Sequence, residues 1–452
     1  MAAGVGRVVT ALVFALSACA PEKHGRVVIL GMDGLEYTML DRMGAELPNF
    51  QRVLTEGARG EMHIPPPIMS PIVWTIIASG YPAEIHGVGG WTNGHGQPFT
   101  GADVRVLRTW DTLSGLGRRS VVSGWLMTWP ASPIHGSILS DKFAWSFPMN
   151  KDQSAPAAAT DVDTWALTYP DALSAVAEPL RPDAAWLDAS VVGYQIRAYG
   201  APYHPLARDE THVRVFESLW RGSDADLGAV YVNGADQVSH LYWPFTDPGN
   251  ADIIRADPTA HARAAASVIK QHPDRRAPPF SEGIDASRLA EAGRWVPDYY
   301  RYLDSVLARV IAQLDPDTTL VLTSDHGFKV STAQPLINGS HHDVAVFVVW
   351  GPHAKAGARA EIDVFDAAPT LHALLGLAPA ADWTGRVADA LVDVAAVEAV
   401  PTYRLARAAF DLGEGSGGGG ADNQLLEQLE ALGYIGEDGQ PDPAIGASRK
   451  QR

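Results

Sequence analysis

The stretch Thr318–Phe328, TTLVLTSDHGF, is the most informative part of the chain, because a short apolar run stops there on an acid, an imidazole and a glycine. Neighbouring side chains on a strand point to opposite faces, so Asp325 and His326 can reach one ligand only after the strand has broken into a turn. Gly327 permits such a break. For an isolated pair of this kind, a strand end with a solvated turn is the better interpretation, so residues elsewhere must decide.

Similar signatures flank other apolar runs. Asp33 follows the run in VVILGMDG, and Asp236 and His240 stand four apart in AVYVNGADQVSH, a spacing that places both on one face of a helix. His341 and His342 come just before a strand-like run in GSHHDVAVFVVWGP. Three carboxylates with up to three imidazoles suit zinc better than magnesium or calcium. Three aspartates would leave two zinc ions short of negative charge, which favours an anionic substrate.

The order of the apolar runs predicts the fold class. Short runs, each followed by a turn, alternate with segments such as 297–314 and 365–377, whose apolar residues recur at helical spacing. This alternation predicts an α/β protein with a mostly parallel central sheet sandwiched by helices. In such sheets ligands bind beyond the carboxyl ends of the strands, where the acids and imidazoles would lie.

Ser70 stands just ahead of the helix-like run Val73–Ala78 in MSPIVWTIIASGYPAEIHGV. A helix N-terminus offers free N–H groups and a positive dipole end, where a phosphate can rest. A metal bound to the Ser70 hydroxyl would lower its pKa and allow it to attack without a histidine base. Taken alone, a simple N-cap explains Ser70 better.

Composition limits the classes of function. The chain has 452 residues, of which 46% are hydrophobic, enough for one large α/β domain or two smaller ones. It carries 52 acidic against 35 basic residues, a formal charge of −17, and no Lys/Arg-rich run. A nucleic-acid duplex is therefore not the expected partner.

The N-terminus is typical of an exported protein. Arg7 precedes the apolar run Val8–Leu16, which is too short to span a bilayer, and small residues lead to Cys19. Residues 16–19, LSAC, resemble the lipobox of bacterial lipoproteins, which implies a signal peptide over 1–19 and a lipid anchor at Cys19. An ordinary signal peptide is the alternative. We expect a lipid-anchored protein on the periplasmic face of an envelope membrane, and the lone cysteine excludes an internal disulfide.

The rest of the chain divides by composition. We expect a catalytic domain over 25–412, interrupted by Pro- and Ala-rich insertions at about 147–222 and 244–296 that form a cap near the site. The Gly-rich linker 413–420, a C-terminal helix at 421–436 and a tail at 437–452 follow.

Five ordered motifs point to a family. VVILGMDG, MSPIVWTIIASGYPAEIHGV, NGADQVSH, LTSDHGF and GSHHDVAVFVVWGP resemble, in order and spacing, the alkaline phosphatase superfamily. The resemblance is closest to its type I phosphodiesterase/nucleotide pyrophosphatase branch, in bacterial exported members. It covers most of residues 26–436 apart from the two insertions, and it implies an alkaline-phosphatase-like fold and a two-zinc phosphoric ester hydrolase acting on small phosphate esters or nucleotides.

The resemblance also implies roles for single residues. One zinc would be held by Asp33, Ser70, Asp325 and His326, and the other by Asp236, His240 and one histidine of the 341/342 pair. His341 is preferred because it stands four residues before Ala345, where relatives commonly carry a glycine. Ser70 matches the nucleophile, which would form a covalent phospho-enzyme that water then hydrolyses.

Departures from the family pattern concern the substrate. Relatives usually carry an asparagine, aimed at a phosphate oxygen, where this chain has Trp91. Asn93 is near enough to replace it, although a turn role suits Asn93 better. Tyr242, just after His240, could line a pocket or pack in the core. No arginine clamp for a terminal phosphate can be placed, which favours diesters over monoesters, and the sulfatase pattern is missing because SPIVW lacks an arginine.

Alternative functions remain at this point. The same superfamily includes phosphomonoesterases and phosphonate or phosphoryl transferases, although export argues against a role in glycolysis. A catalytically silent, lipid-anchored envelope protein is the third hypothesis. Its weakness is that a decayed site should have lost at least one acid or imidazole, and none is missing here.

Overall fold

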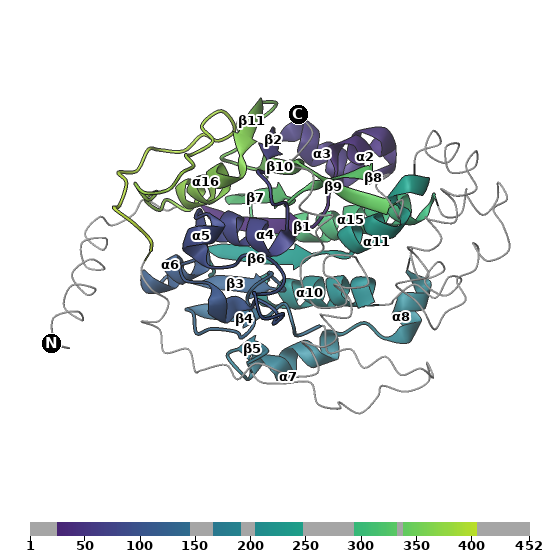
Figure 1. Cartoon of the computed structure of the whole chain (residues 1–452), viewed down its shortest axis with the longest axis horizontal. Helices are drawn as coiled ribbons and strands as arrows, with labels where there is room; N and C mark the ends of the chain where they lie inside the picture. The colour runs from purple at the N-terminus through teal and green to yellow at the C-terminus, as the bar shows by residue number, and fades with distance from the viewer. Residues whose placement is uncertain (1–24, 145–165, 191–203, 247–292, 332–337, 405–452) are drawn as a thin grey trace.

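The computed structural model describes residues 25–144, 166–190, 204–246, 293–331 and 338–404 (Figure 1). The predicted signal peptide, linker, C-terminal helix and tail lie outside the described residues, as does most of the predicted cap range 244–296. Within the described residues, no helix has the length and apolar character needed to cross a membrane.

A nine-stranded sheet forms the centre of the protein, in the order β11-β2-β10-β7-β1-β6-β3-β4-β5. Its strands are β1 (Arg26–Met32), β2 (Ala58–His63), β3 (Ser120–Ser123), β4 (Gly136–Leu139), β5 (Thr168–Tyr169), β6 (Leu227–Val232), β7 (Thr318–Thr323), β10 (Val344–Trp350) and β11 (Arg359–Asp363). Strands β7, β1, β6, β3 and β4 run parallel, whereas β10 is antiparallel to both β7 and β2, and β5 is antiparallel to β4. The predicted mostly parallel sheet is confirmed.

Helices cover both faces of this sheet (Figure 1). They are α2 (Tyr37–Met43), α3 (Pro48–Glu56), α4 (Ser70–Ser79), α5 (Ala83–His86), α6 (Thr109–Gly115), α7 (Leu173–Ala177), α8 (Ala184–Ala189), α10 (His204–Trp220), α11 (Gly234–Tyr242), α15 (Trp295–Ile311) and α16 (Ala367–Leu374). Val28 and Leu30 of β1 pack in a buried cluster with α3, α10 and α15, while Val27 and Ile29 pack in another with α4, α6 and α16. Burial on both faces explains why β1 is apolar without alternation.

Part of the range predicted as a cap, 147–222, belongs to the scaffold instead. Helix α10 packs on strands β6 and β3, and β5 pairs with β4 at the edge of the sheet. The helix was not recognised from sequence because several of its buried side chains are charged, Arg208, Asp209 and Glu210 among them. Apolar periodicity is a poor signal for such a helix.

Strand β7 ends where the opening motif predicted it would, and a small hairpin follows. Strands β8 (Gly327–Ser331) and β9 (Asn338–His342) pair antiparallel, with Phe328 opposite His341 and Gly327 opposite His342. The two histidines expected just before a strand therefore lie within one. This hairpin brings His341 back to the carboxyl end of β7.

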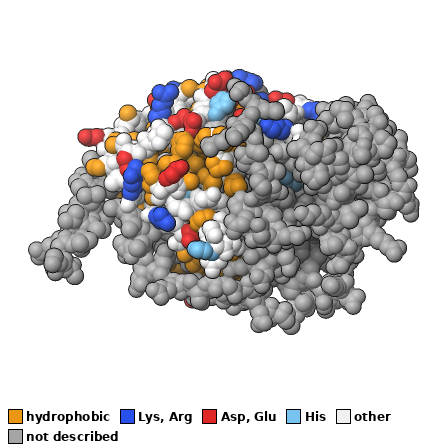
Figure 2. Space-filling view, in the orientation of Figure 1, with side chains coloured by type: hydrophobic (Ala, Val, Ile, Leu, Met, Phe, Trp, Pro, Cys, Tyr) orange, Lys and Arg blue, Asp and Glu red, His pale blue; other side chains and the backbone are white. Residues whose placement is uncertain are grey.

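The surface shown in Figure 2 carries Lys and Arg side chains in separate places, interspersed with Asp and Glu around an apolar area. Such a distribution is expected for a chain with 52 acidic and 35 basic residues. It offers no continuous basic stripe on the described part of this face.

His372 on α16 gives a prediction about stability. Its ring is buried against the edges of Trp383 and Tyr403, with centroids 4.8 and 5.1 Å away. Burial lowers the pKa of His372 from 6.5 to about 3. Between these values the unfolded chain binds a proton that the folded protein does not, so stability falls as the pH falls below 6.5.

We therefore expect His372→Gln to flatten the pH dependence of the free energy of unfolding between about pH 6 and about pH 4, by about 1.4 kcal/mol per pH unit. Urea unfolding at several pH values measures this slope. The exposed His95→Gln serves as the matched control and should leave the slope unchanged. An equal slope in His372→Gln and the parent would contradict the prediction.

Candidate metal centre

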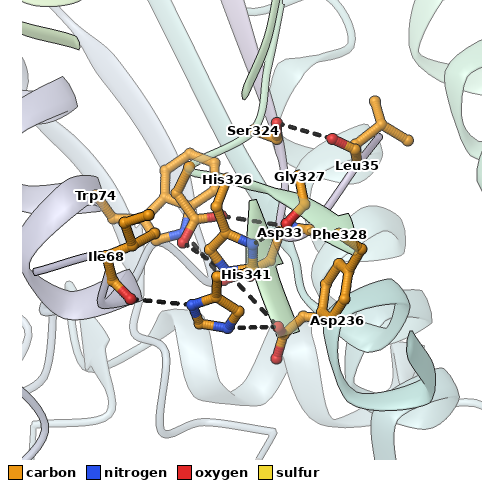
Figure 3. Close-up of polar contacts among 12 residues, drawn as sticks. Asp33, Leu35, Ile68, Trp74, Asp236, Ser324, His326, Gly327, Phe328 and His341 are labelled. Atoms are coloured by element: carbon orange, nitrogen blue, oxygen red, sulfur yellow. Dashed lines mark hydrogen bonds and ion pairs between the residues drawn. The ribbon is translucent and has the colours of Figure 1, made fainter. Parts of the chain in front are cut away.

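The predicted acids and imidazoles meet at the carboxyl edge of the parallel strands. Asp33 follows β1, and its N–H donates to Val232 O at 2.9 Å, which extends the pairing of β1 with β6. Asp325 and His326 follow β7. The remaining members come from helix α11, which follows β6, and from strand β9: Asp236, His240 and His341. Five of the six are buried, and His341 is nearly so. Figure 3 shows Asp33, Asp236, His326 and His341 close together.

The six side chains form two groups of three, in each of which one ligand atom per residue lies within 4.8 Å of the others. In the first, His326 Nε2 lies 3.4 Å from Asp33 Oδ1 and 3.5 Å from Asp325 Oδ2. The second group consists of Asp236, His240 and His341. The groups adjoin, because His326 Nε2 is also 3.6 Å from Asp236 Oδ1.

The distances between donor atoms in the second group are similar to those in the first. Asp236 Oδ1 lies 3.2 Å from His240 Nε2 and 3.6 Å from His341 Nε2. The two Nε2 atoms are 3.1 Å apart. The ring of His341 also stacks on that of His326, with centroids 3.5 Å apart. A single cation could therefore contact all three members of the group.

Backbone carbonyls orient all three imidazoles. His240 Nδ1 donates to Gly339 O at 3.2 Å and His326 Nδ1 to Gly327 O at 3.1 Å. His341 Nδ1 donates to Ile68 O at 2.9 Å (Figure 3). A carbonyl only accepts, so each Nδ1 carries a proton, and each Nε2 is the atom that would bind a metal ion in its deprotonated form. Metal-binding histidines are held in this way.

Unpartnered atoms make the same point. Asp33 Oδ1, Asp325 Oδ2 and His326 Nε2 are buried and make no well-formed hydrogen bond with any residue in the described part of the chain. Buried polar atoms in proteins are almost always paired. A divalent cation satisfies carboxylate oxygens and imidazole nitrogens together, so the first group, to which all three atoms belong, fits a metal ion. The second group offers the same types of donor atom.

The electrostatics of the site are those of crowded acids. Burial and then the charge of Asp33 raise the pKa of Asp325 well above its ordinary value. Burial alone would lower the pKa of His326, but Asp325 and Asp33 raise it to about 10. Burial and the neighbouring His326 lower the pKa of His341 to about 4, which keeps this ring neutral at pH 7. The first group thus attracts positive charge.

Ser70 is the first residue of α4, and Met69 occupies the N-cap position. Its buried hydroxyl makes no capping hydrogen bond, so the simple capping role does not hold. It lies close enough to Asp325 to be one of the smaller influences that lower the pKa of that carboxyl group. A hydroxyl without a capping role beside a metal-type group is free for other chemistry.

The first turn of α4 has fewer free N–H groups for binding an anion than expected. Pro71 has no N–H, and the N–H groups of Ile72 and Val73 both donate to Met69 O, at 2.9 and 3.0 Å. This leaves the N–H of Ser70 and the helix dipole. The expectation of several free N–H groups around a phosphate is therefore corrected.

Three candidates do not join the groups. His342 has a side chain 36% exposed and lies 3.6 Å from Glu36 Oε2. Asn93 accepts hydrogen bonds from the N–H groups of His95 and Gln97 within its own turn. Tyr242 is buried and stacks on Trp295, with centroids 4.7 Å apart, so it packs in the core.

Other residues around the site were not predicted. Glu36 accepts a hydrogen bond from Phe328 N at 3.0 Å, and a Cβ on Gly327 would collide with its carboxylate. Gly327 is not at positive φ, so it is required for space rather than for its conformation. Tyr231 and Trp74 both donate to Asp33 Oδ2, at 2.6 and 3.0 Å. No spacing rule signals such contacts between distant elements.

The fold is a mostly parallel α/β sheet with two metal-type donor groups at its carboxyl edge. The chain belongs to the type I phosphodiesterase/nucleotide pyrophosphatase family, whose model matches residues 27–380. The family suggested by the five motifs is thereby confirmed.

Comparisons with individual proteins give more distant likenesses. No curated protein matches the chain. Murine ectonucleotide pyrophosphatase/phosphodiesterase 5 has a similar structure, with a TM-score of 0.45 and 13% identity, covering 81% of this chain and 100% of that one. The phosphonate monoester hydrolase of Silicibacter pomeroyi gives 0.46 and 15%, covering 81% of this chain and 76% of that one.

Proposed function

We propose that the protein hydrolyses phosphate diesters or nucleotide pyrophosphates, with Ser70 as the nucleophile beside a pair of zinc ions. The observation that carries the proposal is the contact of the two donor groups at 3.6 Å, between His326 Nε2 and Asp236 Oδ1, with the Ser70 hydroxyl next to Asp325. Adjacent cation sites suit a single tetrahedral anion.

The residues divide by role in this proposal. Asp33, Asp325 and His326, with the Ser70 oxygen, would hold one ion, and Asp236, His240 and His341 the other. Mixed nitrogen and oxygen donors favour zinc over magnesium or calcium. Two bound zinc ions would stabilise charge on the phosphoryl oxygens and lower the pKa of the serine hydroxyl.

The chain's own atoms then carry out a double displacement. Ser70 Oγ gives its proton to solvent and attacks phosphorus, the bond to the leaving oxygen breaks, and the leaving group departs as a phosphate or takes a proton from water to leave as an alcohol. Water next attacks the phosphoserine, which frees Ser70 and the product.

We also propose that the protein is exported and held by a lipid at Cys19 on the periplasmic face of an envelope membrane. This rests on residues 1–19, which lie outside the described part of the chain. A phosphodiesterase placed there would act on small phosphate esters outside the cytoplasm. Metabolic labelling with a fatty acid, compared between the parent and Cys19→Ala, tests the anchor.

Paired chromogenic substrates test the proposed activity. We expect purified protein to contain two zinc ions and to hydrolyse bis-p-nitrophenyl phosphate with a kcat/KM about 10-fold above that for p-nitrophenyl phosphate. Removing the metal with a chelator should lower turnover by about 10³-fold or more, and adding zinc should restore it.

Other outcomes would favour the alternatives. A monoester preference would favour a phosphomonoesterase. Transfer of the phosphoryl group to an added alcohol in preference to water would favour a transferase. A protein that holds no metal and turns over neither ester would support the silent envelope protein and reject the proposed function.

A further inference from the structure

Asp33 is held from one side only. Its Oδ2 accepts two hydrogen bonds, from Tyr231 Oη at 2.6 Å and from Trp74 Nε1 at 3.0 Å. Its Oδ1 is buried without a well-formed hydrogen bond from any described residue and lies 3.4 Å from His326 Nε2. The two oxygens of one carboxylate therefore have different surroundings, and only Oδ1 faces the first donor group.

The two donors are themselves rigidly placed. The Trp74 ring meets those of Tyr231 and Trp125 edge to face, with centroids 5.1 Å away in each case. A Cβ on Gly31 would lie 2.8 Å from the Trp74 ring, so this glycine makes room for the indole. All three aromatic side chains are buried, which fixes the direction of the O–H and N–H groups.

The donors also connect Asp33 to the rest of the site. Tyr231 lies on β6, whose next residues lead into α11 with Asp236 and His240. Trp74 is four residues after Ser70 on α4, so it lies on the same face of that helix. A hydrogen bond from Trp74 to Asp33 therefore fixes the rotation of the helix that carries Ser70.

We propose that Tyr231 and Trp74 are positioning residues, which hold Asp33 as a metal ligand through Oδ1 alone and keep the helix of Ser70 in register with it. This inference rests on the proposed function only in taking Asp33 as a metal ligand. Partners of this kind commonly change metal affinity by about 10- to 100-fold when they are removed.

Tyr231→Phe removes one donor and keeps the ring. We expect its affinity for Zn²⁺ at one of the two sites, measured by competition with a chromogenic chelator, to fall by about 10- to 100-fold, while the other site is unchanged. Tyr81→Phe is the matched control. Tyr81 is also buried, it follows the C-terminal end of α4, and its hydroxyl donates to the carboxylate of Asp382 at 2.9 Å. It should bind Zn²⁺ as the parent does.

Trp74→Phe tests the second donor and the link to Ser70. We expect weaker Zn²⁺ binding together with a kcat about 10-fold lower and a nearly unchanged KM, since the serine is misplaced rather than the substrate. Trp110→Phe is its control: Trp110 is buried beside Trp125, and its Nε1 makes no hydrogen bond within the described residues, so only ring size changes.

Zn²⁺ binding is measured without substrate, which separates this inference from the proposed activity. If the parent binds two ions but hydrolyses no ester, the proposed function fails while the comparison of Tyr231→Phe with Tyr81→Phe still decides the inference. If Tyr231→Phe, like its control Tyr81→Phe, binds Zn²⁺ within about twofold of the parent, Tyr231 has only a structural role and the inference is overturned. A parent that binds no Zn²⁺ overturns both.

Discussion

Ser70→Ala is expected to abolish hydrolysis of a chromogenic diester, with kcat/KM reduced by about 10³-fold or more. The physical reason is that the variant removes the only atom that can form the covalent phosphoryl intermediate in the proposed double displacement. The protein should still fold, because the Ser70 hydroxyl makes no well-formed hydrogen bond with the described residues and only its weak contact with Asp325 would be lost. Steady-state kinetics and zinc content, measured on the same preparation, check this result.

Ser79→Ala provides a control within the same helix. Ser79 is as buried as Ser70, and its hydroxyl donates to Thr75 O at 2.7 Å at the other end of α4. We expect this variant to keep its activity within about threefold of the parent while losing about 1 kcal/mol of stability with the hydrogen bond. Equal turnover in Ser70→Ala and Ser79→Ala would remove Ser70 as the nucleophile.

Side chains whose chemistry is unusual for a strand end could be predicted from the sequence. Asp33, Asp325 and His326 each interrupt or follow a continuous apolar run, and parallel strands bring such ends to one edge. The i, i+4 spacing of Asp236 and His240 predicted that both lie on one face of a helix, and their segment is the helix α11. These local patterns were enough to predict the fold class and the grouping of the donor residues.

Contacts between distant elements could not be predicted in the same way. The composition of 147–222 predicts a cap, but helix α10 within that range packs on the sheet, and its buried acids, which partner other elements, hide it from an apolar pattern. Asp209, for example, accepts hydrogen bonds from the N–H groups of Asn233 and Gly234 and from Tyr299 Oη. Tyr231 and Trp74 resemble ordinary core residues until their polar atoms are seen to meet on Asp33.

The neighbouring histidines 341 and 342 give the sharpest test of the second donor group. We expect His341→Ala to lose one of two zinc ions and about 10³-fold in kcat/KM, because its Nε2 lies 3.1 Å from that of His240 and 3.6 Å from Asp236 Oδ1. His342→Ala should keep both ions and most of its activity, since that ring is partly exposed and faces Glu36. Zinc stoichiometry and diester kinetics measure both effects.

The contrast follows from the pairing of β8 with β9. Successive side chains of a strand point to opposite sides, so the register that sets Phe328 opposite His341 turns His341 toward His240 and His342 away. A shift of one residue would exchange the two histidines. If His342→Ala lost the ion and His341→Ala kept it, the hairpin would have the shifted register in solution, and the second donor group would have to be rebuilt around His342.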